Sequence, residues 1–85
     1  MAWNLQITVP AQKDFKRIPP KDQARVKAAL LSMQEDPFKG DIERLKGQGT
    51  AWRRRVGNYR IIYDLFLDNR LIVITAILRR TSSTY

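Results

Sequence analysis

Hydrophobic and polar residues alternate along the second half of the chain in three runs, as they do in β-strands with one buried face. The runs cover residues 52–56, 59–67 and 70–78. Each gap between them holds a dipeptide suited to a tight hairpin turn, Gly57-Asn58 or Asp68-Asn69. The pattern predicts an antiparallel meander of three strands.

The first half of the chain begins with one more alternating run and then changes to helical spacing. Residues 3–9 predict a first strand, which ends at Pro10 because proline cannot donate a hydrogen bond to an interior ladder. A short helix is expected from Ala11 onward. It stops at Pro19-Pro20, since the residue before a proline avoids helical backbone angles.

An apolar stripe at helical spacing predicts a second, longer helix. Its members are Val26, Ala29, Leu30 and Met33. The helix is expected to begin at Pro20 or Lys21 and to end at Asp36-Pro37, and the glycine-containing residues 38–49 are expected to be a connector. We expect an α+β fold in which an N-terminal helical hairpin packs on one face of a mostly antiparallel four-stranded β-sheet.

Length and composition are those of a single soluble domain that spans residues 1–85. The longest strongly apolar run, Leu71 to Leu78, is too short to cross a bilayer. The N-terminus has Asn4 and Gln6 where a signal peptide needs an unbroken apolar stretch, and the chain has no cysteine for disulfides. We therefore expect a cytoplasmic protein that does not engage a membrane.

The chain is strongly basic, with 16 Lys and Arg against 8 Asp and Glu and a formal net charge of +8. Such a charge favours an anionic partner, either nucleic acid or an acidic protein. The basic excess belongs to the C-terminal half, where Asp64 and Asp68 oppose it. Its members are Arg44, Lys46, Arg53, Arg54, Arg55, Arg60, Arg70, Arg79 and Arg80.

Hairpin register predicts which of these arginines meet. If the first turn has two residues, Arg55 lies directly opposite Arg60, and Arg53 lies on the same side of the ribbon, opposite Ile62. Three guanidinium groups then share one face. The other face is apolar apart from Arg54, and it carries Trp52, Val56, Tyr59, Ile61 and Tyr63.

The same register, carried through the second turn, adds a fourth arginine. It places Leu67 opposite Arg70 and Arg60 opposite Ile77, so that Arg79 joins the same face, provided that no bulge changes the parity. The residues expected to converge from three strands are Arg53, Arg55, Arg60 and Arg79.

This arginine face has two possible readings. Arginine on an exposed strand often serves only solubility and the protection of sheet edges. Like charges directly opposite one another destabilise a sheet by up to about 1 kcal/mol, and only Asp64 is expected on the same face to compensate. The planar guanidinium group also donates two parallel hydrogen bonds to a phosphate. We therefore favour a phosphate site over a merely solvated face.

The tyrosines are treated separately from the arginines. Tyr59 and Tyr63 alternate with the arginines and are expected in the core rather than as platforms for base stacking. Tyr85 follows the polar run 81–84, so no packing pattern demands it. The residues alone leave open whether Tyr85 folds back over the cationic face or frays.

Missing residue types narrow the chemistry. The chain has no histidine and no cysteine, and its carboxylates are scattered. Imidazole acid–base pairs, thiolate nucleophiles, ordinary zinc sites and two-metal nuclease centres are thereby disfavoured. No cofactor and no metal are expected, and catalysis on a phosphodiester would have to be metal-free and electrostatic.

Four sequence segments together form a recognisable pattern. They are Phe15-Lys16-Arg17-Ile18, Leu45-Lys46-Gly47, the stretch 52–63 (WRRRVGNYRIIY), and Arg79-Arg80 with Tyr85. On these segments the chain resembles the RelE branch of the RelE/ParE superfamily, toxins of type II toxin–antitoxin systems, over nearly its whole length. The string Gly-x-Tyr-Arg-Ile-Ile-Tyr is the most specific part, and it marks the superfamily more than the activity.

The resemblance implies a ribosome-dependent mRNA endonuclease, a toxin that cuts in the A site without a metal and is silenced by a RelB-like antitoxin. The residues that match catalytic positions of the cleaving branch are Arg53, Arg55, Arg60, Arg79 and Tyr85. Further candidates for contact with RNA or the ribosome are Arg44, Lys46, Arg54 and Arg80.

In the implied reaction, the ribose 2′-OH attacks its own phosphodiester and leaves a 2′,3′-cyclic phosphate and a 5′-OH end. Tyr85, on the resemblance alone, helps to remove the 2′ proton. Arg60 and either Arg53 or Arg55 hold the phosphorane charge, and Arg79 stabilises the leaving 5′-oxygen. Two alternatives stay open: a ParE-like poison of DNA gyrase, and a non-catalytic basic module that binds nucleic acid.

Overall fold

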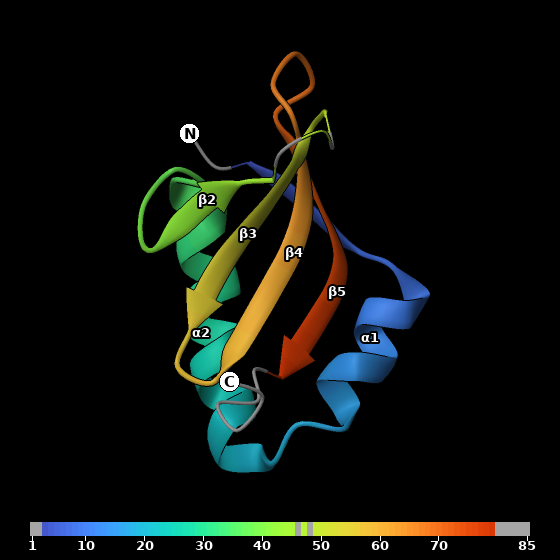
Figure 1. Cartoon of the computed structure of the whole chain (residues 1–85), viewed down its shortest axis with the longest axis vertical. Helices are drawn as coiled ribbons and strands as arrows, with labels where there is room; N and C mark the ends of the chain where they lie inside the picture. Colours follow the sequence, from blue (N-terminus) through green and yellow to red (C-terminus); the bar gives the residue numbers. More distant parts are fainter. Residues whose placement is uncertain (1–2, 46, 48, 80–85) are drawn as a thin grey trace.

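Two helices and five strands form in the computed structural model, which describes residues 3–45, 47 and 49–79 (Figure 1). In chain order they are β1 (Asn4–Ile7), α1 (Val9–Lys16), α2 (Pro20–Glu35), β2 (Ile42–Arg44), β3 (Ala51–Val56), β4 (Tyr59–Phe66) and β5 (Leu71–Arg79). The sheet has the strand order β1-β5-β4-β3-β2, with β1 parallel to β5 and all other neighbours antiparallel. The α+β class is confirmed, but the predicted four-stranded sheet is wrong, because the described part has five strands.

Strand β2 is the element that the sequence pattern missed. It lies inside the predicted connector and pairs with β3, so that Glu43 is the register partner of Arg53. Three residues are too few to show an alternation, and β2 exists because β3 offers it a hydrogen-bonding edge. The backbone N–H of Arg55 donates to the Asp41 carbonyl at 2.9 Å, which extends the contact beyond the strand itself.

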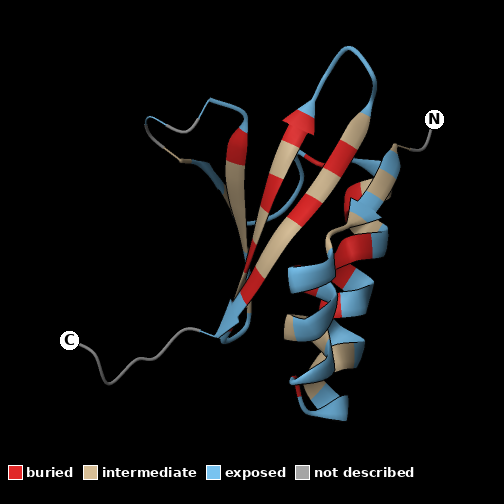
Figure 2. Cartoon of the chain, turned by 90° about the vertical axis from the view of Figure 1, so that its right-hand side faces the viewer, coloured by how far each residue is buried: buried red, intermediate tan, exposed pale blue. Residues whose placement is uncertain are grey.

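The two helices lie on one side of the sheet, but they do not form the predicted hairpin (Figures 1 and 2). Helix α1 packs against β5, and α2 packs against β3. Between the helices, Pro19 has an extended backbone with ψ of 146°, and Gln23 Nε2 donates to the Phe15 carbonyl at 3.1 Å.

The ends of the helices follow local sequence signals. Strand β1 ends at Ile7, earlier than predicted, because Thr8 begins α1: its Oγ1 accepts a hydrogen bond from the Ala11 N–H at 3.4 Å. Pro10 sits in the first turn of this helix, where its missing N–H costs nothing. The predicted bounds of α2 are confirmed.

The core lies between the helices and the face of the sheet that they cover, where buried residues alternate along β4 and β5 (Figure 2). The apolar stripe of α2 is buried as predicted. The strand residues that face it are Tyr59, Ile61, Tyr63, Leu65, Ile72, Ile74 and Ile77. None of the charged residues that the structure describes is buried.

The turn between β3 and β4 confirms the predicted hairpin. Val56 pairs with Tyr59, and Arg55 pairs with Arg60. Gly57 has a φ of 57°, a left-handed value that a side chain disfavours, so this position in the turn suits glycine.

A β-bulge in β5 changes the predicted register between β4 and β5. Near the second turn the register is the predicted one, with Phe66 opposite Leu71. Further along, the partner of Ile62 is Ala76, so that Thr75 is an extra residue on β5. The Thr75 hydroxyl donates to the Ile62 carbonyl at 3.2 Å and holds the bulge in place.

Because of this extra residue, Arg60 lies opposite Leu78 and not opposite Ile77, and Arg79 lies opposite Tyr59. Arg79 therefore follows the buried Ile77 on the helix-covered side of the strand. The prediction that Arg79 shares a face with Arg60 is wrong, since one added residue shifts the alternation of the strand by one.

Neither helix in the described part of the chain is long and apolar enough to span a membrane.

Candidate functional site

Three arginines share the face of the sheet that the helices leave uncovered, here called the open face. Arg55 on β3 and Arg60 on β4 are direct register partners, and Arg53 lies two residues before Arg55, opposite Ile62. The hairpin register predicted from the sequence is confirmed for all three. These residues are called the open-face arginines below.

Arg60 lies centrally in the sheet and is only half-exposed. Its Nε atom is buried and has no hydrogen-bond partner among the residues that the structure describes. Its neighbours on the same face are Ile62 along the strand, Leu78 on β5 and Arg55 on β3. A donor that is shielded from water binds an anionic acceptor more strongly than one in open solvent.

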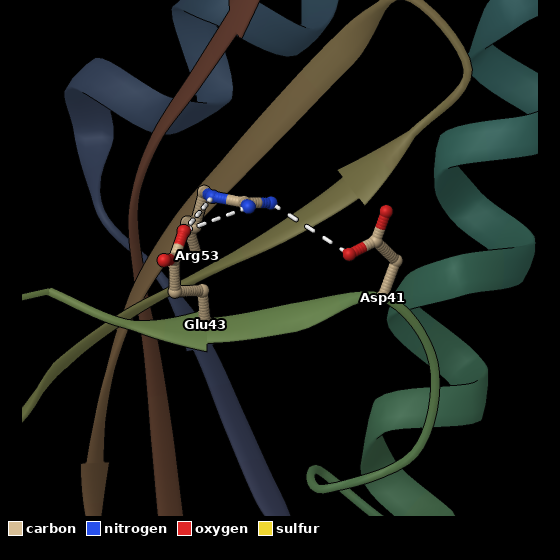
Figure 3. A network of polar contacts seen from close by, with 3 residues as sticks. All are labelled: Asp41, Glu43 and Arg53. Carbon is tan, nitrogen blue, oxygen red and sulfur yellow. Dashed lines mark hydrogen bonds and ion pairs between the residues drawn. The ribbon is translucent and has the colours of Figure 1, made fainter.

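Arg53 is held by two carboxylates (Figure 3). Its Nε and Nη2 atoms donate to Glu43 Oε1 at 3.1 Å and 2.8 Å, and its Nη1 lies 3.9 Å from Asp41 Oδ1. The sequence had indicated only Asp64 as a compensating charge on this face. The two further carboxylates come from β2 and the residue before it, so they were missed together with that strand.

Asp64 is on the open face but is engaged elsewhere. It is the register partner of Ala51, toward the other end of the sheet from Arg55 and Arg60. Its Oδ1 accepts a hydrogen bond from the Thr50 hydroxyl at 3.0 Å. In the described residues, the ion pairs of the open-face arginines therefore come from Asp41 and Glu43.

Arg54 lies on the helix-covered side, as its place between Arg53 and Arg55 requires. Its Nη1 donates to the Ala29 carbonyl of α2 at 3.4 Å, and its guanidinium group lies against Gly40. These contacts tie β3 to α2 and separate Arg54 from the open-face arginines.

Arg79 lines a groove of about 370 Å³ at the helix-covered end of β5. The other lining residues are Asp14, Arg17, Ile18, Pro19, Tyr59, Ile77 and Leu78. The Asp14 carboxylate accepts the Ile77 N–H at 3.0 Å, which fixes the end of α1 to the strand. The structure therefore does not bring the Arg79 backbone position into the open-face set.

The remaining predicted contact residues are dispersed. Arg44 lies on β2 opposite Trp52, and its Nη2 donates to the Gly49 carbonyl at 3.2 Å. Lys46, Arg80 and Tyr85 lie outside the described residues.

Tyr59 and Tyr63 are buried on the helix-covered side, as predicted. The Tyr59 hydroxyl donates to Asp22 Oδ2 at 3.4 Å, and the Tyr63 hydroxyl donates to the Pro37 carbonyl at 3.4 Å. Burial raises the pKa of Tyr63 to about 12, an effect that the nearby Arg54 charge partly opposes. Both tyrosines are thus part of the core.

The residues that the structure describes contain no group of three or more acidic side chains placed to hold a metal ion. The open face carries two cations directly opposite one another, Arg55 and Arg60, and Arg60 also lies opposite Leu78 of β5. The third cation, Arg53, is paired with Glu43 and Asp41. Such a surface can bind a phosphate group by charge-assisted, bidentate hydrogen bonds.

The chain has clear relatives. It matches the family model for the ParE toxin of the type II toxin–antitoxin system parDE over residues 5–83. It is 35% identical over 83 residues to a Methanocaldococcus jannaschii protein named RelE1, covering 94% of this chain and 92% of that protein.

Solved structures with the same fold include complexes of two archaeal proteins. The RelE–RelB complex from Pyrococcus horikoshii OT3 matches with a TM-score of 0.83 and 24% identity, covering 96% of this chain and 99% of that one. The RelB–RelE antitoxin–toxin complex from Methanococcus jannaschii matches with a TM-score of 0.73 and 28% identity, covering 87% and 88%.

Proposed function

The chain belongs to the RelE/ParE family, toxins of type II toxin–antitoxin systems, and on this premise we propose that it is a ribosome-dependent, metal-independent endoribonuclease that cuts mRNA in the A site. The observation that carries the proposal is the opposition of Arg55 and Arg60 on the open face. Two like charges held opposite one another on a sheet repel, and a phosphodiester bound between them would offset the repulsion.

The proposed reaction is a transesterification within the RNA. The ribose 2′-oxygen forms a bond to phosphorus, the bond from phosphorus to the 5′-oxygen breaks, and a 2′,3′-cyclic phosphate and a 5′-OH end result. Arg60 binds the phosphorane with Arg55 from the neighbouring strand. Because its Nε atom is buried, Arg60 stabilises the transition state more than a solvated cation does.

The reaction also needs a base for the 2′ proton and an acid for the leaving 5′-oxygen. On the resemblance, Tyr85, which lies outside the described residues, takes the 2′ proton. Water supplies the proton of the leaving 5′-oxygen, because a guanidinium group has too high a pKa to be a good acid. The bulge at Thr75 puts Arg79 on the helix-covered side of β5, away from Arg55 and Arg60, so Arg79 is not assigned to this step.

The ribosome supplies the orientation that these groups lack. A tyrosine base and a guanidinium group are poorly matched to proton transfer at neutral pH, so much of the rate depends on how the mRNA is held. We therefore expect little cutting of naked RNA. Action on ribosomes also places the protein in the cytoplasm.

A RelB-like antitoxin is the proposed regulatory partner. The relatives from Pyrococcus horikoshii and Methanococcus jannaschii are both seen in RelE–RelB complexes. An antitoxin segment with acidic residues would be attracted by the net charge of +8.

Primer extension on mRNA in programmed 70S ribosomes tests the proposed function. The wild-type protein should cut in the A-site codon, and Arg60→Ala should lower the rate by a factor of about 10² or more, because it removes a charged ligand of the transition state. Arg70→Ala is the matched control: Arg70 is exposed in the turn at the other end of β4 and should leave cutting unchanged.

The family model named for ParE supports one rival, the poisoning of DNA gyrase. A gyrase supercoiling assay with the same three proteins separates the two functions. Wild-type protein that leaves mRNA intact on ribosomes and blocks supercoiling would replace the endonuclease by the gyrase poison.

A further inference from the structure

We propose that Glu43, assisted by Asp41, holds Arg53 away from RNA in the free protein, so that Arg55 and Arg60 take the phosphate and Glu43 limits how strongly the open face binds. The proposal rests on the proposed function in one respect, because it takes the open face as the surface that binds RNA. It assigns Glu43 as a positioning residue, acting through Arg53.

The contacts of Arg53 occupy one edge of its guanidinium group with a carboxylate and bring a second carboxylate close (Figure 3). Nε and Nη2 both point to Glu43 Oε1, at 3.1 Å and 2.8 Å, and Nη1 points toward Asp41 Oδ1 at 3.9 Å. The Nε–Nη2 edge, one of the two forks with which a guanidinium group grips a phosphate, is therefore already used by Glu43. The Nη1 group makes no hydrogen bond to Asp41, but the Asp41 carboxylate lies beside it and would repel a phosphate there.

The other two open-face arginines differ from Arg53 in this respect. Neither Arg55 nor Arg60 has an ion pair or a side-chain hydrogen bond within the residues that the structure describes. Arg55 and Arg60 are therefore available to bind a phosphate, whereas Arg53 is engaged with Glu43 and Asp41.

The backbone keeps Glu43 beside Arg53. The two residues are register partners on β2 and β3, and the Arg55 N–H to Asp41 carbonyl bond of 2.9 Å anchors the preceding residues. Opposite charges on directly facing strand positions attract one another, so the register itself maintains the pair.

The pair is also weak enough to open. The side chains of Glu43 and Asp41 are 63% and 60% exposed, whereas that of Arg53 is 21% exposed. Water screens the attraction of such exposed carboxylates, and a phosphate competes well for the same fork. Until Arg53 is released, the two carboxylates repel any phosphate that approaches it.

The test measures RNA binding by Glu43→Gln, which keeps the side-chain shape and removes the charge. A short fluorescein-labelled single-stranded RNA is titrated at several salt concentrations, and anisotropy gives the dissociation constant. Freed Arg53 should tighten binding about 3- to 10-fold at low salt and steepen the slope of log K against log salt by about 0.7, the value for one more phosphate contact on a single strand. Asp41→Asn should act in the same direction with a smaller effect, because its ion pair is longer.

Two further variants make the result specific to the pair. Asp68→Asn removes the same charge from the exposed β4–β5 turn and should change the affinity for RNA less than twofold, since this turn is at the far end of β4 from Arg60, beyond the screening length at moderate salt.

Arg53→Gln should change the affinity for RNA little in the wild-type background and should abolish the gain in affinity in the Glu43→Gln background. An equal loss in both backgrounds, or unchanged binding by Glu43→Gln, would overturn the proposal.

The ribosomal primer extension assay, run on the same proteins, distinguishes failure of this proposal from failure of the nuclease. If wild type cuts in the A site but Glu43→Gln binds RNA no better, Glu43 does not restrain Arg53 and the nuclease stands. If Glu43→Gln binds RNA more tightly in the Arg53-dependent way but wild type does not cut, the restraint stands and the nuclease falls.

Discussion

The Tyr63 hydroxyl lies on the covered side of the sheet, fully removed from solvent, and donates to the Pro37 carbonyl. Burial raises the pKa of Tyr63 to about 12 because the phenolate would be poorly solvated there. On the other side of the same strand, the Nε atom of Arg60 is buried and has no hydrogen-bond partner among the described residues. Strand β4 thus presents the buried Tyr63 to the core and Arg60 to the open face.

Tyr63 makes stability depend on pH at the alkaline end. Its pKa rises from 10.0 to about 12 on folding, so the folded state holds this proton more tightly than the unfolded state. The resulting stabilisation is complete below pH 10 and is lost as the pH rises to about 12, a change of about 2 to 3 kcal/mol. Urea unfolding of wild type and Tyr63→Phe between pH 8 and pH 12 measures it.

The phenylalanine variant should lose this part of the alkaline destabilisation, so the difference in stability between the two proteins should shrink or reverse above pH 10. Lysines and other tyrosines titrate equally in both proteins and cancel in the difference. Parallel pH profiles would show that Tyr63 is not shielded as described.

At the scale of the elements, the β3–β4 hairpin controls whether Arg55 meets Arg60. Gly57 is its critical residue, with a φ of 57°. A Cβ atom added there would also approach a guanidinium nitrogen of Arg25 to 3.1 Å. The long Arg25 side chain can move, so backbone strain is the larger cost of a substitution.

Gly57→Ala should lower the free energy of unfolding by about 1 kcal/mol, because alanine resists a positive φ. Gly57→Asn should lose less, since asparagine tolerates this conformation. Gly49→Ala is the control for backbone strain alone: Gly49 has the same φ of 57°, and no atom lies within 4 Å of an added Cβ. Thermal unfolding of the three variants compares them. Alanine and asparagine variants of equal stability at position 57 would contradict the strain argument.

The sequence predicted the elements whose signals are local. These are the apolar stripe of α2, the prolines that limit the helices and the Gly57-Asn58 turn, none of which depends on knowing which other element packs against it. The register that places Arg53, Arg55 and Arg60 on the open face followed from that turn. Strand β2 was missed because only pairing with β3 makes three residues a strand.

The bulge at Thr75 was the second failure, and it moved Arg79. In the structure the buried residues of β5 are spaced by two from Ile72 to Ile74 but by three from Ile74 to Ile77, as the extra residue demands. The sequence did not show this, because residues 71–74 and 76–78 are all apolar and a strict alternation could bury either set. The sequence also did not show that α1 would pack against β5 and α2 against β3. This arrangement depends on contacts between each helix and the sheet, and the hydrophobic pattern of a helix does not identify the strand that it covers.

At the scale of the whole molecule, the chain has a formal net charge of +8, and it carries cations both on the open face and on the helices. The helices carry exposed lysines, among them Lys13, Lys16 and Lys21. On the open face, Arg55 and Arg60 are direct register partners, with Arg53 two residues before Arg55. If binding depended on total charge alone, the two sides would contribute equally to RNA affinity.

Two triple variants separate position from total charge. Changing Arg53, Arg55 and Arg60 to Gln, or Lys13, Lys16 and Lys21 to Gln, lowers the net charge from +8 to +5 in either case, because 8 − 3 = 5. The open-face variant should flatten the slope of log K against log salt by about 1 to 2, the loss of roughly two phosphate contacts, and the helix variant should flatten it far less. Equal slopes in the two variants would mean that RNA binds the whole basic surface without preference.

The place of β1 in the sheet has a consequence for how the protein is made. The first strand of the chain pairs only with β5, the last strand of the described part, so translation produces one partner long before the other. Until β5 has emerged, Ile72, Ile74 and Ile77 cannot pack, and the core lacks the apolar side chains that this strand contributes. Such long-range pairing delays folding until the distant segment is available. The β1–β5 edge of the sheet therefore forms only after β5 has emerged from the ribosome, although β1 is the first strand to be made.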